Sequence, residues 1–328
     1  MTDKILRWGL LSTARINQAL IEPLRSSKRN TLAAVASRSQ ATAEAYAKEN
    51  KIEKAYGSYD ALLADPEIDV IYNPLPNHMH AEWTIKAVEA GKHVLVEKPI
   101  ALTVAEVEAM DAAAQKHGRV VAEAFMYRHH PQTLKIVDMV SGGKLGKVKL
   151  VRGTFTFQLN HEGDIRFDPA MGGGALWDVG CYPLSFARTV LGAEPLEVFG
   201  WQVTGSTGID ETFVAQLRFP DDVYAQFNCS FAVPFISTAE VFGDAGRLAV
   251  PRPFQPGVKE HILLTHPDGV TDTITIKSQP LYSGEVEDMA DAVLLGKTPR
   301  VSLADSRANV AAILALFESA RSGKPVMI

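Results

Sequence analysis

The chain has 328 residues, 46% of them hydrophobic and 22% charged, with 33 lysines and arginines against 38 aspartates and glutamates. This length predicts about two domains, the apolar fraction excludes a disordered chain, and a formal net charge of -5 excludes a general nucleic-acid binder, which needs a basic surface. No run is long and apolar enough to predict a membrane span and the first residues lack a secretory pattern, so we expect a cytoplasmic protein with no membrane partner.

Residues 1–125 alternate short apolar runs with helical patterns. The alternation predicts strands at 5–11, 32–36, 70–73, 93–96 and 120–122, with helices at 14–24, 41–48 and 81–90. A further helix is expected after Thr103, because Glu106 follows it at the spacing of a capping box. Fully apolar strands separated by helices predict a doubly wound parallel sheet, a Rossmann domain, whose ligand binds at the carboxyl ends of the strands.

Residues 126–328 follow a different pattern and predict an α+β domain. A long run with a period of two residues covers 147–158, and further strands are expected at 198–205, 212–219, 223–231, 238–242, 262–265 and 271–276. Helices are expected at 175–191, 282–295 and 304–322. This half therefore predicts a large, mostly antiparallel open sheet with helices on one face, and its C-terminal helices could pack back on the first domain.

The turn after the first predicted strand is the natural place for a dinucleotide pyrophosphate. Where a Rossmann domain usually carries G-x-G-x-x-G, this chain has Ser12, Ala14 and Asn17 at the glycine positions. Small residues at the first two positions still permit a close approach of the backbone, whereas Asn17 departs from the motif. The candidate phosphate-binding residues are Ser12, Thr13, Ala14, Arg15 and Ile16. An ordinary strand-to-helix turn stays the alternative.

The end of the second predicted strand indicates which nucleotide would bind. An NAD enzyme usually has an acidic residue there for the ribose 2′-hydroxyl, whereas an NADP enzyme has a cation for the 2′-phosphate. The chain reads Ser37-Arg38-Ser39 at this point, with no acidic residue before Glu44. Ser37 and Arg38 therefore favour NADP over NAD, because a guanidinium matches the geometry of a phosphate. A solvated loop arginine is the alternative interpretation.

Two segments place ionisable side chains where catalysis would need them. Lys98 follows the apolar strand at 93–96, at the end where the ligand is expected. In the run G-G-G-A-L-W-D-V-G-C-Y at 172–182, Asp178 and Tyr182 are four residues apart and so share one face of the predicted helix. The three glycines would let the start of that helix approach a ligand closely. A rim lysine and a packed core tyrosine are the alternatives.

Three motifs of this chain occur together in a known family. P-N-H-M-H stands at 76–80, Glu97-Lys98-Pro99 follows G-K-H-V-L-V, and the glycine-rich run at 172–182 is an independent signal. Together they resemble the Gfo/Idh/MocA oxidoreductase family over nearly the whole chain. In having a tyrosine at position 182, the chain resembles the branch of this family that contains glucose-fructose oxidoreductase, dimeric dihydrodiol dehydrogenase and NADP-dependent D-xylose dehydrogenase. The resemblance implies that Tyr182 is the general acid/base and that Lys98 stabilises the developing alkoxide.

The resemblance also assigns further positions. The candidate cofactor-binding residues that it adds are Leu75, Pro76, Asn77, His80, Glu97, Lys98 and Arg128. The candidate substrate-binding residues are Lys98, Arg166, Trp177, Asp178 and Tyr182. His80 could instead be a helix histidine packed beside Trp83, and Arg166 a solvated arginine. No metal is expected, because hydride transfer between carbon atoms needs none and the histidines are scattered along the chain.

The function implied by the resemblance is NADP(H)-dependent hydride transfer between nicotinamide and a sugar or polyol carbinol or carbonyl carbon. An aldose 1-dehydrogenase that oxidises D-xylose or D-glucose to the lactone fits it, as a homodimer formed through the C-terminal sheet. Two alternatives stay open. One is a sugar-sugar transhydrogenase or keto-sugar reductase that retains its nucleotide, and the other is a non-enzymatic nucleotide-sensing regulator on the same fold.

Overall fold

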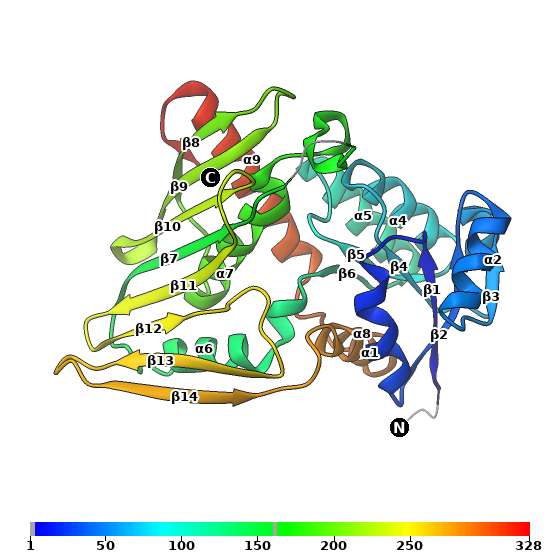
Figure 1. Ribbon diagram of the computed structural model, residues 1–328, viewed down its shortest axis with the longest axis horizontal. Coiled ribbons are helices and arrows are strands. Elements are labelled where there is room, and N and C mark those ends of the chain that lie inside the picture. The colour runs from blue at the N-terminus through cyan, green and yellow to red at the C-terminus, as the bar shows by residue number, and fades with distance from the viewer. Residues whose placement is uncertain (1–3, 160–162) are drawn as a thin grey trace. The chain divides into compact units, whose positions relative to one another are not determined.

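The computed structural model describes residues 4–159 and 163–328, which form two compact units (Figure 1). The first unit contains Met1–His129 and Tyr282–Arg307, and the second contains His130–Leu281 and Ala308–Ile328. The segment Tyr282–Arg307 therefore belongs with the start of the chain, although most of the second unit lies between them in sequence.

The sheet of the first unit has six parallel strands in the order β3-β2-β1-β4-β5-β6, which is the order of a Rossmann fold. The strands are β1 (Leu6–Leu11), β2 (Asn30–Ala36), β3 (Lys54–Tyr56), β4 (Val70–Asn73), β5 (His93–Glu97) and β6 (Val121–Ala124). The helices are α1 (Asn17–Ser26), α2 (Gln40–Glu49), α3 (Tyr59–Leu63), α4 (His80–Glu89), α5 (Val104–His117) and α8 (Ser283–Leu295). The predicted doubly wound parallel sheet is confirmed.

The core of the first unit joins segments from both ends of the chain. Trp8 of β1, Tyr72 of β4 and Leu95 of β5 lie in one buried cluster. Val286 and Met289 of α8 belong to the same cluster, so a helix from the far end of the sequence covers this sheet. Apolar burial of this kind is the main stabilising contribution to such a core.

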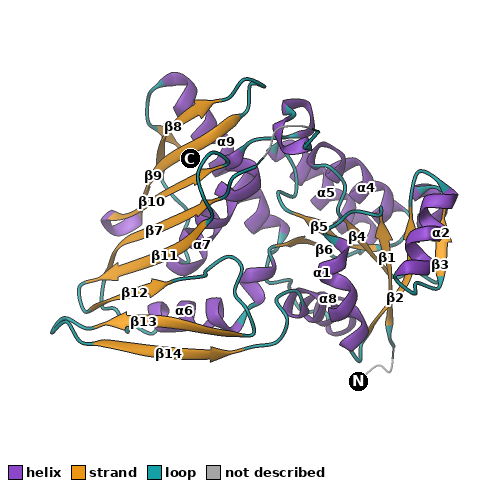
Figure 2. Ribbon diagram, viewed as in Figure 1, coloured by secondary structure: helices purple, strands orange, loops and turns teal. Residues whose placement is uncertain are grey.

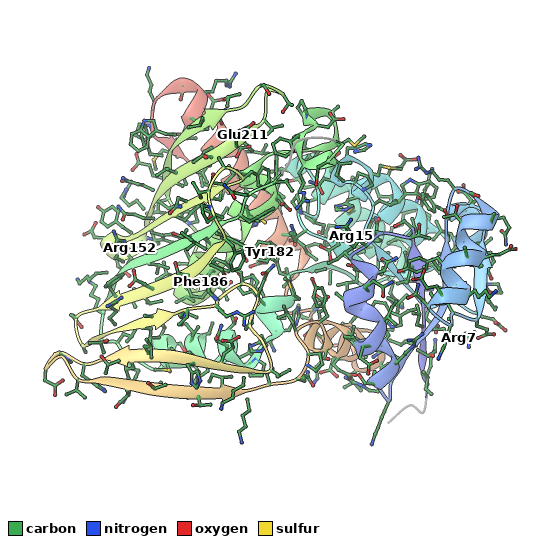
Figure 3. All side chains as sticks on the ribbon, in the orientation of Figure 1. Arg7, Arg15, Arg152, Tyr182, Phe186 and Glu211 are labelled. Atoms are coloured by element: carbon green, nitrogen blue, oxygen red, sulfur yellow. The ribbon has the colours of Figure 1, made fainter. Side chains whose placement is uncertain are left out.

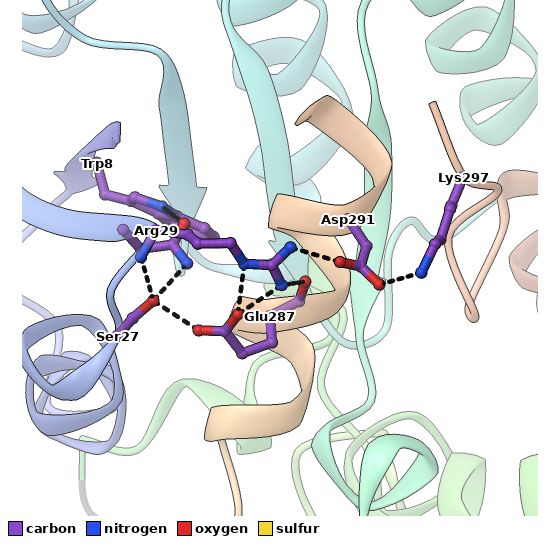
Figure 4. A network of polar contacts seen from close by, with 7 residues as sticks. Trp8, Ser27, Arg29, Glu287, Asp291 and Lys297 are labelled. Atoms are coloured by element: carbon purple, nitrogen blue, oxygen red, sulfur yellow. Dashed lines mark hydrogen bonds and ion pairs between the residues drawn. The ribbon is translucent and has the colours of Figure 1, made fainter. Parts of the chain in front are cut away.

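A network of polar contacts also fastens α8 to the start of β2 (Figure 4). Nε of Arg29 donates to Glu287 at 2.9 Å, and its Nη1 donates to Asp291 at 2.5 Å. The Ser27 hydroxyl donates to the other carboxylate oxygen of Glu287, and Lys297 pairs with Asp291 at 2.8 Å. The Arg29 side chain is 33% exposed, so each ion pair alone contributes little and the connected network matters more.

The sheet of the second unit has nine strands in the order β14-β13-β12-β11-β7-β10-β9-β8-β15 (Figure 2). The strands are β7 (Val148–Thr156), β8 (Glu197–Thr204), β9 (Asp210–Phe219), β10 (Val223–Ser230), β11 (Ile236–Gly243), β12 (Gly246–Val250), β13 (Lys259–Thr265), β14 (Thr271–Lys277) and β15 (Val326–Met327). Neighbouring strands pair antiparallel except β7 and β10, which pair in parallel. The predicted mostly antiparallel sheet is confirmed.

Helices cover one face of this sheet, as predicted, and leave the other face open (Figure 1). The helices are α6 (Pro131–Ser141), α7 (Cys181–Leu191) and α9 (Leu303–Ser322), of which α9 begins in the first unit. A Cβ at Gly153 of β7 would lie 2.7 Å from Pro183, so a glycine there lets α7 approach the strand closely. Phe213 of β9 packs against Phe317 of α9 on the same face, at a centroid distance of 5.8 Å.

The helix predicted over 175–191 is present, but its first part differs in type from a regular α-helix. Residues Leu176–Gly180 form a π-helical turn, η5, and α7 continues from Cys181. Pro183 explains the change, because proline has no N–H to donate and its ring clashes with the carbonyl group four residues earlier. π turns are rare, occur mostly as single turns within α-helices, and are frequent at functional sites.

Candidate active site

The predicted cofactor-binding residues meet at one edge of the first unit's sheet. The six strands are parallel, so their carboxyl ends lie along the same edge. Ser12 to Ile16 follow β1, and Ser37 and Arg38 follow β2. Leu75 to Asn77 and His80 come after β4. Lys98 comes directly after Glu97, the last residue of β5, and Arg128 comes after β6. The candidate site in this unit is therefore built from turns at the ends of successive strands.

The turn after β1 contains a serine in a backbone conformation that usually requires glycine. Ser12 has a φ of 136°, a conformation that favours glycine, and its hydroxyl accepts from the Ala14 N–H at 3.2 Å. Nδ2 of the buried Asn17 donates to the Ser12 carbonyl at 2.8 Å, so the residue that departs from the motif closes the turn. Within the described chain α1 has no side-chain cap and no acidic residue in its first turn, and Arg15 beside it is exposed (Figure 3). Such a helix start suits an anion.

The turn after β2 presents one unpaired cation. Ser37 is buried, and the Ser39 hydroxyl caps α2 by accepting from the Thr42 N–H at 3.5 Å. Arg38 is exposed, and no carboxylate of residues 4–159 or 163–328 forms an ion pair with it. Burial raises the pKa of Tyr59 and the positive charge of Arg38 opposes that rise, which places the guanidinium within electrostatic reach of this tyrosine.

His80 joins two turns of the candidate site. After β4 the chain forms the short helix η1 (Asn77–Met79), and His80, fully buried, begins α4. Its Nδ1 lies 2.8 Å from the carbonyl oxygen of Pro99, and its Nε2 lies 2.7 Å from that of Leu75. Burial lowers the pKa of His80 to about 4, and the two carbonyl contacts oppose that shift. A neutral imidazole carries a single N–H, so it can donate to one of the two carbonyls at a time. The buried ring of His80 thus contacts backbone carbonyls of both turns.

Lys98 follows Glu97, the last residue of β5, whose carboxylate accepts two hydrogen bonds. The Tyr72 hydroxyl donates to Oε1 of Glu97 at 2.5 Å, and the backbone N–H of Lys98 donates to Oε2 at 3.2 Å. The Lys98–Pro99 peptide bond is cis, and Lys98 is half-buried. These contacts hold the Lys98 backbone at the carboxyl edge of the sheet.

Arg128 lies after β6, in the short helix η2 (Met126–His129), and is buried. Its Nη1 donates to Oδ2 of Asp305 at 3.1 Å, and both residues belong to the first unit. Sequence reasoning did not identify Asp305, which is 177 residues away along the chain. Only the tertiary fold brings this acidic residue to the candidate site.

Tyr182 lies in the first turn of α7 and is 5% exposed (Figure 3). Its ring packs edge-on against Phe155 at 5.3 Å and tilted against Phe254 at 5.9 Å, which themselves stack at 5.3 Å. Trp177, 7% exposed, packs against Phe317 at 5.8 Å. The structure thus gives Tyr182 an aromatic surrounding, to which Phe254 comes from a loop that carries no recognisable motif.

Arg166 and Asp178 form an ion pair in the second unit. Nη1 of Arg166 lies 3.6 Å from Oδ2 of Asp178. The opposite side of the guanidinium binds Asp164 through two hydrogen bonds, of 2.9 Å from Nε and 2.6 Å from Nη2. The structure therefore brings together two of the predicted substrate-binding residues, Arg166 and Asp178, and adds Asp164.

Two of the three glycines, Gly173 and Gly174, also leave room for atoms of the chain itself. A Cβ at Gly174, where φ is 124°, would lie 2.1 Å from Oδ1 of Asp210, and one at Gly173 would lie 2.5 Å from the Arg166 carbonyl oxygen. Asp210, which was not predicted, accepts from the Leu176 N–H at 2.7 Å and so caps η5. Burial raises the pKa of Asp210 to about 7.

The described residues contain no group of three or more His, Cys, Asp or Glu side chains that could hold a metal ion. None of the helices in the described part of the chain is long and apolar enough to cross a membrane. Cys181 and Cys229 are both buried, and neither forms a disulfide within the described residues.

Both units match known families. Residues 6–125 match the oxidoreductase family with an NAD-binding Rossmann fold, and residues 133–249 match the GFO/IDH/MocA C-terminal domain. The chain is 38% identical over 324 residues to D-xylose 1-dehydrogenase (NADP(+)) 2 of Haloferax volcanii, which covers 98% of this chain and 99% of that protein.

Two solved structures share the fold over nearly the whole chain. Aldose-aldose oxidoreductase from Caulobacter crescentus, complexed with glycerol, has a TM-score of 0.92 at 25% identity and covers 99% of this chain and 100% of its own. KijD10, a 3-ketoreductase from Actinomadura kijaniata in complex with NADP and TDP-benzene, has a TM-score of 0.90 at 29% identity. The match covers 96% of this chain and 98% of KijD10. The predicted resemblance is confirmed, and the chain belongs to the Gfo/Idh/MocA oxidoreductase family.

Proposed function

We propose that this protein is an NADP(H)-dependent oxidoreductase that transfers hydride between nicotinamide and a sugar or polyol, acting as an aldose 1-dehydrogenase on a free sugar such as D-xylose or D-glucose. The observation that carries the proposal is the common edge at which five strand ends present the candidate residues. The similarity to an NADP-dependent D-xylose dehydrogenase over nearly the full length of both chains supports the substrate class.

The first unit has the features that NADP needs. The uncapped start of α1 offers backbone N–H groups to a pyrophosphate, and the Ser12 conformation keeps the turn tight. Arg38 and Ser37 would hold the 2′-phosphate, because Arg38 has no acidic partner among the described residues. The remaining residues proposed to line the cofactor are Thr13, Ala14, Arg15, Ile16, Leu75, Pro76, Asn77, His80, Glu97, Lys98 and Arg128.

The proposed catalytic residues are Lys98 and Tyr182. NADP, when bound, supplies the hydride acceptor or donor at its nicotinamide ring. The Tyr182 hydroxyl would take or return the proton of the reacting hydroxyl, and the Lys98 ammonium would stabilise the alkoxide that develops. KijD10 has also been crystallised as two variants, one with a lysine replaced and one with a tyrosine replaced. These two residues are as far apart in the KijD10 sequence as Lys98 and Tyr182 are in this chain. This equal spacing supports the assignment.

The experiment that tests the function follows the near-ultraviolet absorbance of reduced nicotinamide. D-Xylose and D-glucose are each supplied with NADP and, in parallel, with NAD. Sugar-dependent reduction that is faster with NADP supports the proposal. Absence of sugar-dependent reduction with both nucleotides, in a protein that binds neither of them, would contradict it.

A retained nucleotide is the second candidate mode, and the similarity to an aldose-aldose oxidoreductase favours testing it. A transhydrogenase keeps its cofactor through the reaction, so the purified protein would carry nicotinamide absorbance without added nucleotide. Reduction of that bound nucleotide by one sugar and its reoxidation by a second would identify this mode. An exchangeable nucleotide identifies a dehydrogenase instead.

A homodimer through the open face of the second unit's sheet is part of the proposal. Trp201 and Val214, 56% and 43% exposed, lie opposite each other on β8 and β9, and Tyr224 on β10 is 47% exposed. Exposed apolar groups on neighbouring strands are typical of an interface. Val214→Arg should halve the mass measured by light scattering, whereas Val270→Arg, at an exposed turn, should leave it unchanged. An unchanged mass in Val214→Arg would contradict this interface.

The proposed location is the cytoplasm. Cys181 and Cys229 are buried thiols that form no disulfide within the described residues, which suits a reducing compartment. Fractionation of the source cells should recover the NADP-linked activity with cytosolic marker enzymes, and recovery with an extracellular or membrane fraction would contradict the location.

A further inference from the structure

The ring of Phe254 packs across the first turns of α7. Tyr182 and Phe186 are four residues apart on this helix and so share one of its faces (Figure 3). Phe254 lies tilted against the Tyr182 ring at a centroid distance of 5.9 Å and edge-on to the Phe186 ring at 6.1 Å. It also stacks on Phe155 of β7 at 5.3 Å and is fully buried. One side chain therefore connects the start of the helix to the sheet of the second unit.

The chain around Tyr182 is not a continuous regular helix. The preceding residues form the π turn η5, and Gly180 at the N-cap of α7 provides no side-chain cap. Pro183, the next residue, has no N–H, so one main-chain hydrogen bond of a regular helix is missing. Side-chain packing therefore contributes more to the position of Tyr182 than it would in the middle of an unbroken helix.

Phe254 lies in the loop 251–258, which joins β12 to β13. This loop contains Pro251, Pro253 and Pro256. Each proline fixes its own φ and also restricts the residue before it, so few backbone conformations are available to the loop. A segment that is already restricted in the unfolded chain loses less conformational entropy on folding. The prolines therefore favour one fixed position for Phe254.

Two side chains at the start of α6 hold this loop on either side of Phe254. Nε2 of Gln132 donates to the Arg252 carbonyl at 2.9 Å, and Nε2 of His130 lies 3.1 Å from the Gly257 carbonyl oxygen. Nδ1 of His130 accepts from the Gln132 N–H at 3.0 Å, so the proton of a neutral ring is on Nε2, which donates to Gly257. Both side chains are buried, and all these residues belong to the second unit.

We propose that Phe254 is a positioning residue for Tyr182: the anchored loop 251–258 holds the Phe254 ring against the Tyr182 ring and so fixes where the Tyr182 hydroxyl lies. This inference rests on the proposed function, in which Tyr182 is the general acid/base. The hydroxyl oxygen of a tyrosine lies on the axis of its ring, so a contact that fixes the ring also fixes the oxygen. Proton transfer needs hydrogen-bond distance, so a displaced ring reacts more slowly.

The first test removes the Phe254 ring but keeps an apolar side chain. In Phe254→Leu we expect kcat for D-xylose oxidation by NADP to fall by about 10- to 100-fold, because the Tyr182 ring loses its support. The Kd for NADP should stay unchanged, since the residues proposed to bind the nucleotide belong to the first unit. Phe219→Leu is the matched control, because Phe219 of β9 is equally buried in the second unit. It should keep the wild-type kcat.

A double-mutant cycle then shows whether the loss acts through Tyr182. The hydroxyl is absent in Tyr182→Phe, so adding Phe254→Leu to this variant should change the residual kcat by less than about twofold. A purely structural role would lower kcat equally in both backgrounds. An equal loss in the Tyr182→Phe background would therefore overturn the inference.

A spectroscopic readout does not depend on activity. In protein labelled with fluorotyrosine, the fluorine resonance of Tyr182 is identified by its absence in Tyr182→Phe. Phe254→Leu removes the ring current of Phe254, so this resonance should shift, whereas Phe219→Leu should leave it in place. An unmoved resonance in Phe254→Leu would overturn the contact on which the inference is built.

The outcomes separate this inference from the proposed function. Wild-type turnover of D-xylose together with an undiminished kcat in Phe254→Leu overturns the inference and leaves the function intact. Turnover of no sugar by the wild type with NADP or NAD overturns the function and the positioning role with it, whereas the fluorine shift still reports the packing of the two rings.

Discussion

The backbone N–H of Leu176 donates a hydrogen bond of 2.7 Å to the buried carboxylate of Asp210. Burial raises the pKa of Asp210 to about 7, whereas in the unfolded chain it is about 3.9. The folded protein therefore binds one proton more than the unfolded chain between these values, and its stability falls as the pH rises through that window.

Asp210→Asn should remove this pH dependence while keeping the oxygen that accepts from Leu176. Relative to the wild type, the variant should gain stability from pH 4 to pH 7, by roughly 4 kcal/mol at the upper end. Denaturant unfolding at several pH values measures the difference. Parallel stability profiles of the two proteins would show that Asp210 does not titrate in this way.

Glu285 presents a second buried carboxyl group, in the first turn of α8. It is 1% exposed, and neither of its oxygens has a hydrogen-bond partner among the described residues. Burial raises its pKa well above the usual range, with further increases from Glu97 and Asp288. The folded protein keeps this proton where the unfolded chain loses it, so stability is lost as the pH rises above about 4.3.

Glu285→Gln should therefore unfold at a higher temperature than the wild type, with a difference that widens from pH 5 to pH 8. The matched control is Glu82→Gln, which removes an exposed carboxylate from α4 and should show no such widening. Thermal unfolding followed by circular dichroism suffices. A difference that stays constant across this range would mean that Glu285 is ionised in the folded state.

Gly174 should tolerate no side chain. Its φ of 124° and the 2.1 Å that would separate a Cβ from Asp210 predict that Gly174→Ala destabilises the second unit by more than about 2 kcal/mol. Gly269→Ala is the comparison, because Gly269 also has a positive φ, 86°, but its Cβ would meet nothing within 4 Å. Equal losses in urea unfolding would show that backbone conformation alone matters at Gly174.

Arg38 should discriminate between the nucleotides. Arg38→Ala removes the proposed charge-assisted contact with the 2′-phosphate, so the Kd for NADP should rise by about 10- to 100-fold. The Kd for NAD should change little and serves as the internal control. Fluorescence titration of the same protein sample gives both constants. Equal increases in the two dissociation constants would show that Arg38 does not contact the 2′-phosphate.

The part of the candidate site that could be predicted from the sequence lies at strand ends. Apolar runs such as the one before Lys98 identify a parallel strand, and the geometry of a parallel sheet then collects the strand ends at one edge. The capping box of Thr103 and Glu106 is likewise a local pattern, and it is present in the structure. Local periodicity and local hydrogen bonding are thus readable from one sequence.

The rest depends on contacts between distant segments. Asp210 is 34 residues from Leu176, and Asp305 is 177 residues from Arg128, so no local spacing links either pair. The helix α6 and the short elements β3, α3 and β12 were also missed. In β3 all three residues are half-buried, which leaves no apolar alternation to detect. The π turn of η5 could have been anticipated from Pro183, because a proline at that position disfavours a regular helix.

Proton handling by Tyr182 and alkoxide stabilisation by Lys98 are the central claim, and the rate of NADP reduction by D-xylose in Lys98→Ala and Tyr182→Phe tests it most directly. Lys48→Ala, at an exposed position of α2, is the matched control. We predict that kcat falls by about 10²- to 10⁴-fold in the two test variants, while the Tyr182→Phe protein still binds NADP and the control stays at the wild-type rate. Wild-type turnover in either Lys98→Ala or Tyr182→Phe would contradict the mechanism.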